Sequence, residues 1–441
     1  MAAHTFVATG DSIITRHVSN RTDQAFLDMV ELIRGADSAF TNLEIVTPKG
    51  PWIPFSEHGG ANLGSPPFIL DELKWMGFNL YSAANNHGVD YTFQGLVDTM
   101  DALKERDLVY AGAGRTLGEA RSPGYFDSPS GRVGLVACAS TFGRSAQAAA
   151  SRADIGGRPG LSPMRYETQY VVDSQRLAAV QDLDEALGTD AVTRKMREWM
   201  PYPNPDAYRF LGGDFVEGDT PRVSTSPKES DLDDISRWIS EARRQSDLVV
   251  VSIHAHEGQN GDLNTQDIAD FIVPMARHWI DAGADVFVGH GPHTLRAMEI
   301  YKGKPIFYSL GNFFFTSSTN PKYGSEIYEQ HGLSPSATPA DLKEARTRRE
   351  DGSYKGMYAD RQFWRTVIPV CRFEGRELVD LALHPVELGF DLPDTQRGIP
   401  VLADNEEGAI ILKNLEELSA PFGTELKIES SRERMVARVT L

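Results

Sequence analysis

The sequence predicts an α/β protein with mixed sheets. Short apolar runs alternate with stretches of helical spacing along most of the 441 residues. Strands that alternate with helices in this way are typical of folds in which helices cover a mostly parallel sheet. Polar residues gather where the apolar runs end, and open α/β sheets bind their ligands at that edge. We therefore expect a functional site built from strand ends.

The first third of the chain supplies the first strand–helix units. Strands are predicted at residues 5–10, 38–46, 79–85, 108–113 and 131–141, and helices at residues 22–37, 67–78 and 92–107. Thr22 or Asp23 can cap the first helix, because a short polar side chain there accepts from the free N–H groups of the first turn. Gly77 is expected to end the second helix.

The second half repeats the pattern. Strands are predicted at residues 247–258, 286–290, 363–373 and 377–388, and helices at 231–246, 267–285 and 406–423. Residues 298–315 indicate a hairpin that turns at Lys302-Gly303. We expect a single domain spanning 1–441, with polar insertions at about 142–227 and 316–360. The first insertion is rich in Gly, Pro, Arg and Asp, carries one helical piece near residues 174–187, and is interpreted as a possible cover for the site.

Composition excludes several classes of partner. The formal net charge is -18, which disfavours nucleic acid and anionic membranes. No run of residues approaches the roughly 18 apolar residues of a membrane-spanning helix. Cys138 and Cys371 lie in apolar runs and are expected to be buried thiols, as in a reducing compartment. We expect a cytoplasmic protein, and its oligomeric state stays open.

Five predicted strand ends carry polar residues. Taken singly, each has a plain structural interpretation, such as a turn, a helix cap or a buried histidine. Together they indicate a site, and "GHGPH" is the most specific piece because it places two imidazoles on a tight turn. The five groups are Gly10-Asp11, Asn42-Leu43-Glu44, Asn85-Asn86-His87 with Asp90, His254-Ala255-His256-Glu257, and His290 with His293.

Carboxylate, carboxamide and imidazole side chains suit a divalent metal ion. Oxygen ligands favour Mg²⁺, Ca²⁺ or Mn²⁺, whereas imidazoles favour Zn²⁺, Fe²⁺, Ni²⁺ or Mn²⁺. Such an ion polarises a carbonyl or phosphoryl oxygen or activates a water molecule. Histidines that do not bind the ion can move protons near neutral pH when a carboxylate lies beside them.

The order of these groups resembles the CapA family of the calcineurin-like metallophosphoesterase superfamily. "ANNHGVDY", "GADVFVGHGPH" and "MEIYKGKPIFYSLGNFFF" carry the resemblance, which covers most of the chain outside the two insertions. It implies a four-layer α/β/β/α sandwich. It also implies metal ligation by Asp11, Glu44, Asn86, His254 and His290, and an acid/base role for His87.

The chain departs from the superfamily pattern at two places. Ile13 stands where a metal-binding histidine is expected, and the closing pair His290 and His293 has one extra residue between its members. These departures favour a single divalent ion, which is Ca²⁺, Mn²⁺, Mg²⁺ or Zn²⁺, with Ca²⁺ favoured by the resemblance. A single ion with spare histidines suits proton transfer better than phosphoester hydrolysis.

The resemblance therefore suggests a metal-dependent peptide epimerase of the lasso-peptide type. Such an enzyme inverts the Cα of the C-terminal residue of a precursor peptide whose C-terminus is free. Two-base inversion needs proton carriers on opposite faces of that carbon, for which we consider His87 with Asp11 or Asp90, and His256 or His293 with Asp262 or another acid. Trp52, Phe55 and Phe313–Phe315 either line a peptide pocket or pack in the core. The alternative is a CapA-like metallophosphoesterase or an enzyme related to poly-γ-glutamate.

Overall fold

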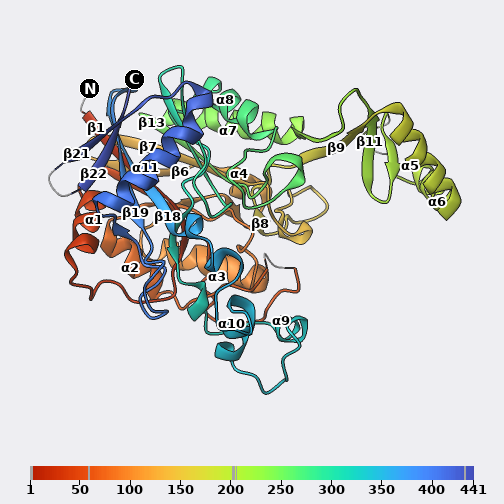
Figure 1. Ribbon diagram of the computed structural model, residues 1–441. Helices are drawn as coiled ribbons and strands as arrows, with labels where there is room; N and C mark the ends of the chain where they lie inside the picture. Colours follow the sequence, from red (N-terminus) through yellow and green to blue (C-terminus); the bar gives the residue numbers. More distant parts are fainter. Residues whose placement is uncertain (1–2, 58–59, 201–203, 205, 432–433) are drawn as a thin grey trace.

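The computed structural model describes residues 3–57, 60–200, 204, 206–431 and 434–441. Within this part of the chain, two large sheets form the body of the protein (Figure 1). The side chains of the candidate site lie on the strands of these two sheets or in the loops that follow those strands. The strand–helix alternation predicted from the sequence is confirmed.

The larger sheet has the order β21-β22-β19-β18-β1-β2-β3-β4, with β17 also paired to β1 and β20 to β19. Its strands β1 to β4 run parallel, whereas β18 pairs antiparallel with β1. The strands are β1 (Ala3–Ile13), β2 (Ser38–Asn42), β3 (Leu80–Ser82), β4 (Val109–Ala111), β17 (Asn312–Phe315), β18 (Arg365–Glu374), β19 (Glu377–Glu387), β20 (Val401–Leu402), β21 (Leu426–Ser431) and β22 (Arg434–Val439).

The smaller sheet has the order β15-β16-β14-β13-β7-β6. Its central strands are parallel, and β15 and β16 form the predicted hairpin, in which Tyr301 pairs with Lys304. The strands are β6 (Gly124–Ser128), β7 (Gly131–Ala139), β13 (Leu248–His254), β14 (Val286–His290), β15 (Met298–Tyr301) and β16 (Lys304–Phe307).

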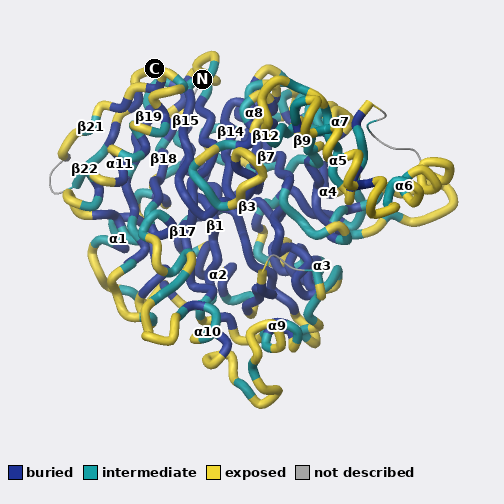
Figure 2. Tube along the Cα trace, turned by 45° about the vertical axis from the view of Figure 1, so that its right-hand side comes forward, coloured by how far each residue is buried: buried dark blue, intermediate teal, exposed yellow. Residues whose placement is uncertain are grey.

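The hydrophobic clusters place the two sheets face to face. Phe6 and Phe40 of the larger sheet share one buried cluster with Leu135, Val250 and Val288 of the smaller sheet. Because successive side chains of a strand point to opposite faces, their neighbours pack outward against helices. The outer clusters hold α1 (Gln24–Arg34) and α2 (Phe68–Met76) against the larger sheet, and α7 (Glu229–Gln245) and α8 (Ile272–Asp281) against the smaller one. The result is a four-layer α/β/β/α sandwich, with the strands buried in the middle (Figure 2).

Local signals fix the helices of the larger sheet as predicted. Asp23 caps α1 by accepting a hydrogen bond from the N–H of Phe26. Gly77 ends α2 with φ of 108°, a left-handed conformation that glycine adopts without strain. The remaining helices of the body are α3 (Thr92–Lys104), α4 (Leu117–Arg121) and α11 (Asn405–Ser419). Cys138 and Cys371 are buried free thiols, as expected.

Residues 166–227, here called the arm, project away from the two sheets (Figure 1). The sequence predicts one helical piece in this region, whereas the structure has two helices and a separate four-stranded sheet. The arm leaves and re-enters the body side by side, because Tyr166 pairs with Pro227. Its elements are β9 (Tyr166–Val172), α5 (Ser174–Leu187), α6 (Thr189–Arg197), β10 (Tyr208–Phe210), β11 (Gly213–Glu217) and β12 (Arg222–Pro227).

The second insertion lies close to the loops that follow β1 and β3. It contains the short helices α9 (Ser325–Gln330) and α10 (Pro339–Thr347). Asn62, which is fully buried, joins it to the body: its side chain accepts from the N–H of Gly324 and donates to the carbonyl oxygen of Asp90. No helix within the described residues is long and apolar enough to cross a lipid bilayer.

Candidate metal centre

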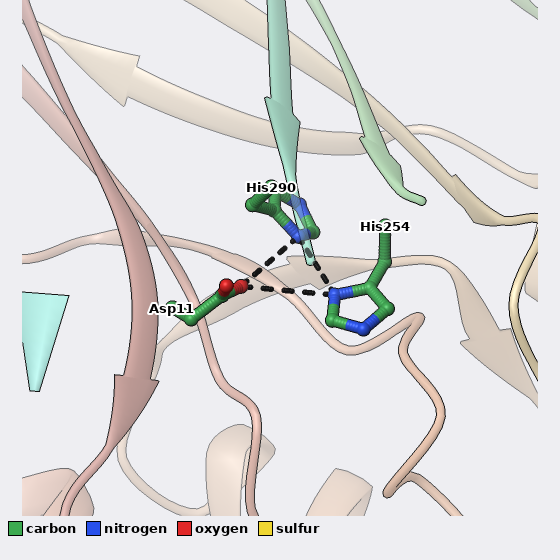
Figure 3. Close-up of side chains that lie close together, drawn as sticks. All are labelled: Asp11, His254 and His290. Carbon is green, nitrogen blue, oxygen red and sulfur yellow. Dashed lines mark hydrogen bonds and ion pairs between the residues drawn. The ribbon is translucent and has the colours of Figure 1, made fainter. Parts of the chain in front are cut away.

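Strand ends from both sheets meet at one point between the sheets. Asp11 lies near the end of β1 and Glu44 just after β2, while His254 and His290 close β13 and β14 in the smaller sheet. His254 pairs directly with His290 in the parallel register, so both imidazoles reach the same level. All four side chains are fully buried. Figure 3 shows Asp11 facing His254 and His290 across the space between the sheets.

Asp11 is held as a carboxylate acceptor. Its Oδ1 accepts from Asn42 Nδ2 at 2.8 Å, and its Oδ2 accepts from the backbone N–H of Gly291 at 3.0 Å. The Nδ1 atoms of His290 and His254 lie 3.4 and 3.7 Å from Oδ1. Burial alone would raise the pKa of Asp11, but its contacts with His254 and His290 bring that pKa well below its ordinary value. Gly291 fits here because its φ is 116° and a Cβ would press on the backbone of Ala255.

Glu44 is a buried carboxylate for which the described residues provide no hydrogen-bond donor. Its Oε1 lies 3.8 Å from the Nε2 atoms of three imidazoles, those of His87, His254 and His293. Burial, and then the charge of Asp11, raise the pKa of Glu44 well above its ordinary value. The side-chain oxygen of Asn86 is also buried without a donor among the described residues. Such orphaned oxygens are unusual, and a bound cation would supply the partner that they lack.

The outer nitrogens of three histidines face hydrogen-bond acceptors. His87 Nδ1 lies 2.6 Å from Asp90 Oδ2, His256 Nδ1 lies 2.6 Å from Asn264 Oδ1, and His293 Nδ1 lies 2.9 Å from Asn312 Oδ1. An acceptor at Nδ1 places the proton there and leaves a lone pair on Nε2. Metal-binding histidines are oriented by such outer partners in this way.

The two kinds of acceptor have different consequences. The carboxylate beside His87 brings a negative charge as well as an acceptor, whereas the amide oxygens beside His256 and His293 fix the tautomer without adding charge. The nearest carboxylate oxygen to His293 Nδ1 is Asp11 Oδ2, at 3.6 Å. Burial lowers the pKa values of His256 and His293, and it lowers the pKa of His254 to about 3. His254, His256 and His293 are therefore neutral lone-pair donors.

The donor set fits a divalent cation. Lone pairs of Glu44 and several imidazoles face one another, an arrangement that a cation at the centre would make favourable. The donor atoms form three overlapping groups, within each of which they lie no more than 4.8 Å apart: Asp11 with His254 and His290, Glu44 with His254 and His256, and Asp11 with Glu44 and His293. The predicted ligands Asp11, Glu44, His254 and His290 thus belong to groups that can hold an ion, and so do His256 and His293.

The structure corrects one expected partner. Asp262, considered as the acid beside His256 or His293, is exposed, and Asn264 and Asn312 occupy those positions instead. Of the two acids considered for His87, Asp90 is in contact. The sequence reasoning missed Asn264 and Asn312 because a single asparagine in a loop or after a turn gives no periodic signal.

Ile13, the residue that replaces the expected histidine, is 2% exposed and packs in the outer hydrophobic cluster of the larger sheet. Phe313 and Phe314 also pack in that core, which confirms the packing interpretation for these two rings. Phe315 belongs to the same cluster, and its ring also stacks on His293 at a centroid distance of 6.1 Å. Trp52 packs against Tyr91 beside the loop that carries His87.

Two facing sheets, outer helices and a carboxylate–imidazole cluster at the strand ends define a four-layer α/β/β/α protein with a candidate metal centre between its sheets. The family model of the bacterial capsule synthesis protein PGA_cap matches residues 5–317. The chain belongs to this family, which confirms the CapA resemblance.

Known relatives span most of the chain. An uncharacterized protein of Sinorhizobium fredii is 35% identical over 437 residues, which is 96% of this chain and 91% of the relative. The PGA biosynthesis protein CapA of Bacillus subtilis is 25% identical, over 76% of this chain and 71% of its own. Among solved structures, a hypothetical protein from Thermus thermophilus aligns with a TM-score of 0.39 and 12% identity, covering 87% of this chain and 99% of that one.

Proposed function

We propose that this chain is a metal-dependent enzyme in which His87, held by Asp90, moves a proton beside one divalent ion. The observation that carries this proposal is the contrast among the histidines: His87 is paired with a carboxylate at 2.6 Å, whereas His256 and His293 face amide oxygens. A carboxylate at hydrogen-bond distance suits a histidine that moves a proton during the reaction, and His293 approaches one, that of Asp11, only at 3.6 Å.

The ion would be held by donors among Asp11, Glu44, His254 and His290, with Asn86, His256 and His293 as further donors. His254 would give it one nitrogen only, either Nδ1, which faces Asp11 and His290, or Nε2, which faces Glu44 and His256. When bound, the ion would withdraw electron density from a substrate oxygen and stabilise negative charge that develops there. An imidazole-rich donor set favours Mn²⁺, Fe²⁺ or Zn²⁺ over Ca²⁺. This part of the proposal differs from the Ca²⁺ that the resemblance suggests.

For the reaction itself, the donor set favours proton transfer at carbon. The replacement of a metal-binding histidine by Ile13, which packs in the core, weakens a second ion site of the kind that phosphoester hydrolysis uses. We therefore propose an epimerase that acts on the C-terminal Cα of a peptide. His87 would take the Cα proton on one face, and a second group near the cluster would return a proton on the other. A substrate carboxylate would face the ion.

The relatives favour a second candidate and support it better than they support the epimerase. The B. subtilis relative is described as a PGA biosynthesis protein, and the family model is that of a capsule synthesis protein. An enzyme acting on poly-γ-glutamate or on a phosphoester is therefore the second candidate. The net charge of -18 disfavours a long polyanionic substrate, unless the ion or a local basic surface binds it.

One experiment separates the candidates. The metal-loaded protein is incubated in D₂O with peptides that have a free C-terminus, with poly-γ-glutamate and with phosphomonoesters and phosphodiesters. Deuterium at the C-terminal Cα together with inversion of that centre supports the epimerase. Release of phosphate or shortening of poly-γ-glutamate, without deuterium uptake by any peptide, replaces it with the second candidate.

A further inference from the structure

Asn312 is a fully buried carboxamide that contacts a single histidine at two points. Its Oδ1 lies 2.9 Å from His293 Nδ1, and its Nδ2 donates to the carbonyl oxygen of the same residue at 3.3 Å. The Nδ2 also donates to the carbonyl oxygen of Phe363 at 2.9 Å. Because both carbonyl oxygens need a donor, the amide must present its oxygen to the imidazole ring.

His293 needs such a contact because its backbone is unusual. Its φ is 60°, in the left-handed region that non-glycine residues seldom adopt. Phe315 stacks on its ring and the ring of His256 meets it edge-on. Its Nδ1 lies 3.6 Å from Asp11 Oδ2, farther than the 2.9 Å that separate it from Asn312 Oδ1. Asn312 therefore holds both the backbone and the ring of His293 in the orientation that directs Nε2 towards Glu44, at 3.8 Å.

Asn312 also links the position of the His293 ring to that of strand β1. It starts β17 and lies opposite Asp11 in the parallel pairing of β1 with β17. Gly10 permits this close approach, since a Cβ at position 10 would lie 1.8 Å from the carbonyl oxygen of Gly311. A shift of β17 would therefore move Asn312 relative to Asp11 and carry the ring of His293 with it.

We infer that Asn312 is a positioning residue that fixes the tautomer and direction of His293 for metal binding. This inference rests on the metal centre of the proposed function. Outer partners of metal-binding histidines commonly change metal affinity about 10- to 100-fold when they are removed. The role assigned to Asn312 acts only through His293, which gives the inference a specific test.

The test is a double-mutant cycle read by metal binding. Metal-free wild type, Asn312→Ala, His293→Ala and the double variant are titrated with Co²⁺, followed by the visible absorption of the bound ion. Asn312→Ala should weaken binding about 10- to 100-fold in the wild-type background and cause no further loss when His293 is absent. Asn312→Asp, which keeps an acceptor opposite Nδ1, should recover part of the affinity.

Asn320→Ala is the matched control, because Asn320 is also buried and hydrogen-bonded but lies in the second insertion and contacts the loop at residues 62–64 instead. It should leave Co²⁺ affinity unchanged. Circular dichroism in EDTA checks folding, and Asn312→Leu replaces the alanine variant in the cycle if the latter does not fold. The role of Asn312 would be overturned if Asn312→Ala weakened Co²⁺ binding equally with and without His293, or if it did not weaken binding in the wild-type background. A folded wild type that binds no divalent ion overturns the metal centre as well.

Discussion

His87 lies closer to a carboxylate than the other histidines of the cluster do. Its Nδ1 is 2.6 Å from Asp90 Oδ2, whereas the Nδ1 atoms of His254, His290 and His293 lie 3.7, 3.4 and 3.6 Å from the carboxylate oxygens of Asp11. Replacing His87 with alanine removes the proposed proton carrier but none of the groups of three donors described above. We predict that His87→Ala lowers kcat by at least about 100-fold, the scale of general acid–base catalysis, while metal content changes little. Metal analysis and turnover of the purified variant check this. Asp90→Asn should give a smaller loss, and a His87→Ala variant that keeps near-normal turnover would exclude His87 from the reaction.

From the raised pKa of Glu44 we predict that the stability of the metal-free protein depends on pH. Because the pKa of Glu44 is raised above the ordinary 4.5, folded protein retains a proton that the unfolded chain has already released. The unfolded state is thus favoured progressively as the pH rises above about 4.5, at up to about 1.4 kcal/mol per pH unit from this group.

Glu44→Gln removes this component, so the stability of the metal-free wild type relative to the variant should fall with rising pH. Urea unfolding in EDTA between pH 5 and 8 measures the difference. The same variant should bind divalent metal more weakly, since it loses a charged donor. Wild-type and variant stabilities that stay parallel over this range would show that Glu44 ionises normally.

Among the elements, those of the arm contribute least to the hydrophobic packing of the body. None of the four hydrophobic clusters contains a described arm residue except Tyr166, which packs on the margin of one of them and stacks on Phe271. Thr168 pairs with Thr225 across β9 and β12. We predict that replacing residues 169–224 with Asn-Gly, a favoured two-residue hairpin turn, leaves a folded protein with unchanged metal affinity.

Thermal unfolding and Co²⁺ titration of the shortened chain check this prediction. Loss of metal binding would show that the arm supports the metal centre. Retained metal binding with lost turnover on a peptide would instead assign the arm to substrate binding, in line with its expected role as a cover. A full-length variant with a scrambled α6 sequence is the control, because it changes the arm without shortening the chain.

The elements also show how far the sequence predicts this fold. The helices and strands of the body were predictable because each buries one apolar face, and Asp23 and Gly77 mark their helix ends. The strands of the arm were not, because they pair mainly with one another and only Val171 and Phe210 among their large apolar residues are buried. The site groups were predictable as strand ends, but Asn264 and Asn312 were not, since their partners are set by loop geometry.

At the scale of the whole molecule, the candidate metal centre joins the two sheets. Asp11 lies in the larger sheet and Glu44 just after its strand β2, whereas His254 and His290 belong to the smaller sheet. An ion bound between them should stabilise the folded state by about 2.7 kcal/mol when its concentration is 100 times the Kd. We predict that EDTA lowers the Tm of the wild type and has little effect on His254→Ala. Metal analysis should find one tightly bound ion per chain, and two would contradict the single-ion centre.

The pairing of β1 has a consequence for biosynthesis. This strand precedes its neighbours β17 and β18 by about three hundred or more residues. During translation β1 can pair only with β2, so its other edge stays open to wrong partners. The buried carboxylate of Asp11 receives the N–H of Gly291 equally late. Correct closure of the larger sheet is therefore a slow, long-range event, and the nascent chain is most prone to aggregate before β17 and β18 are made.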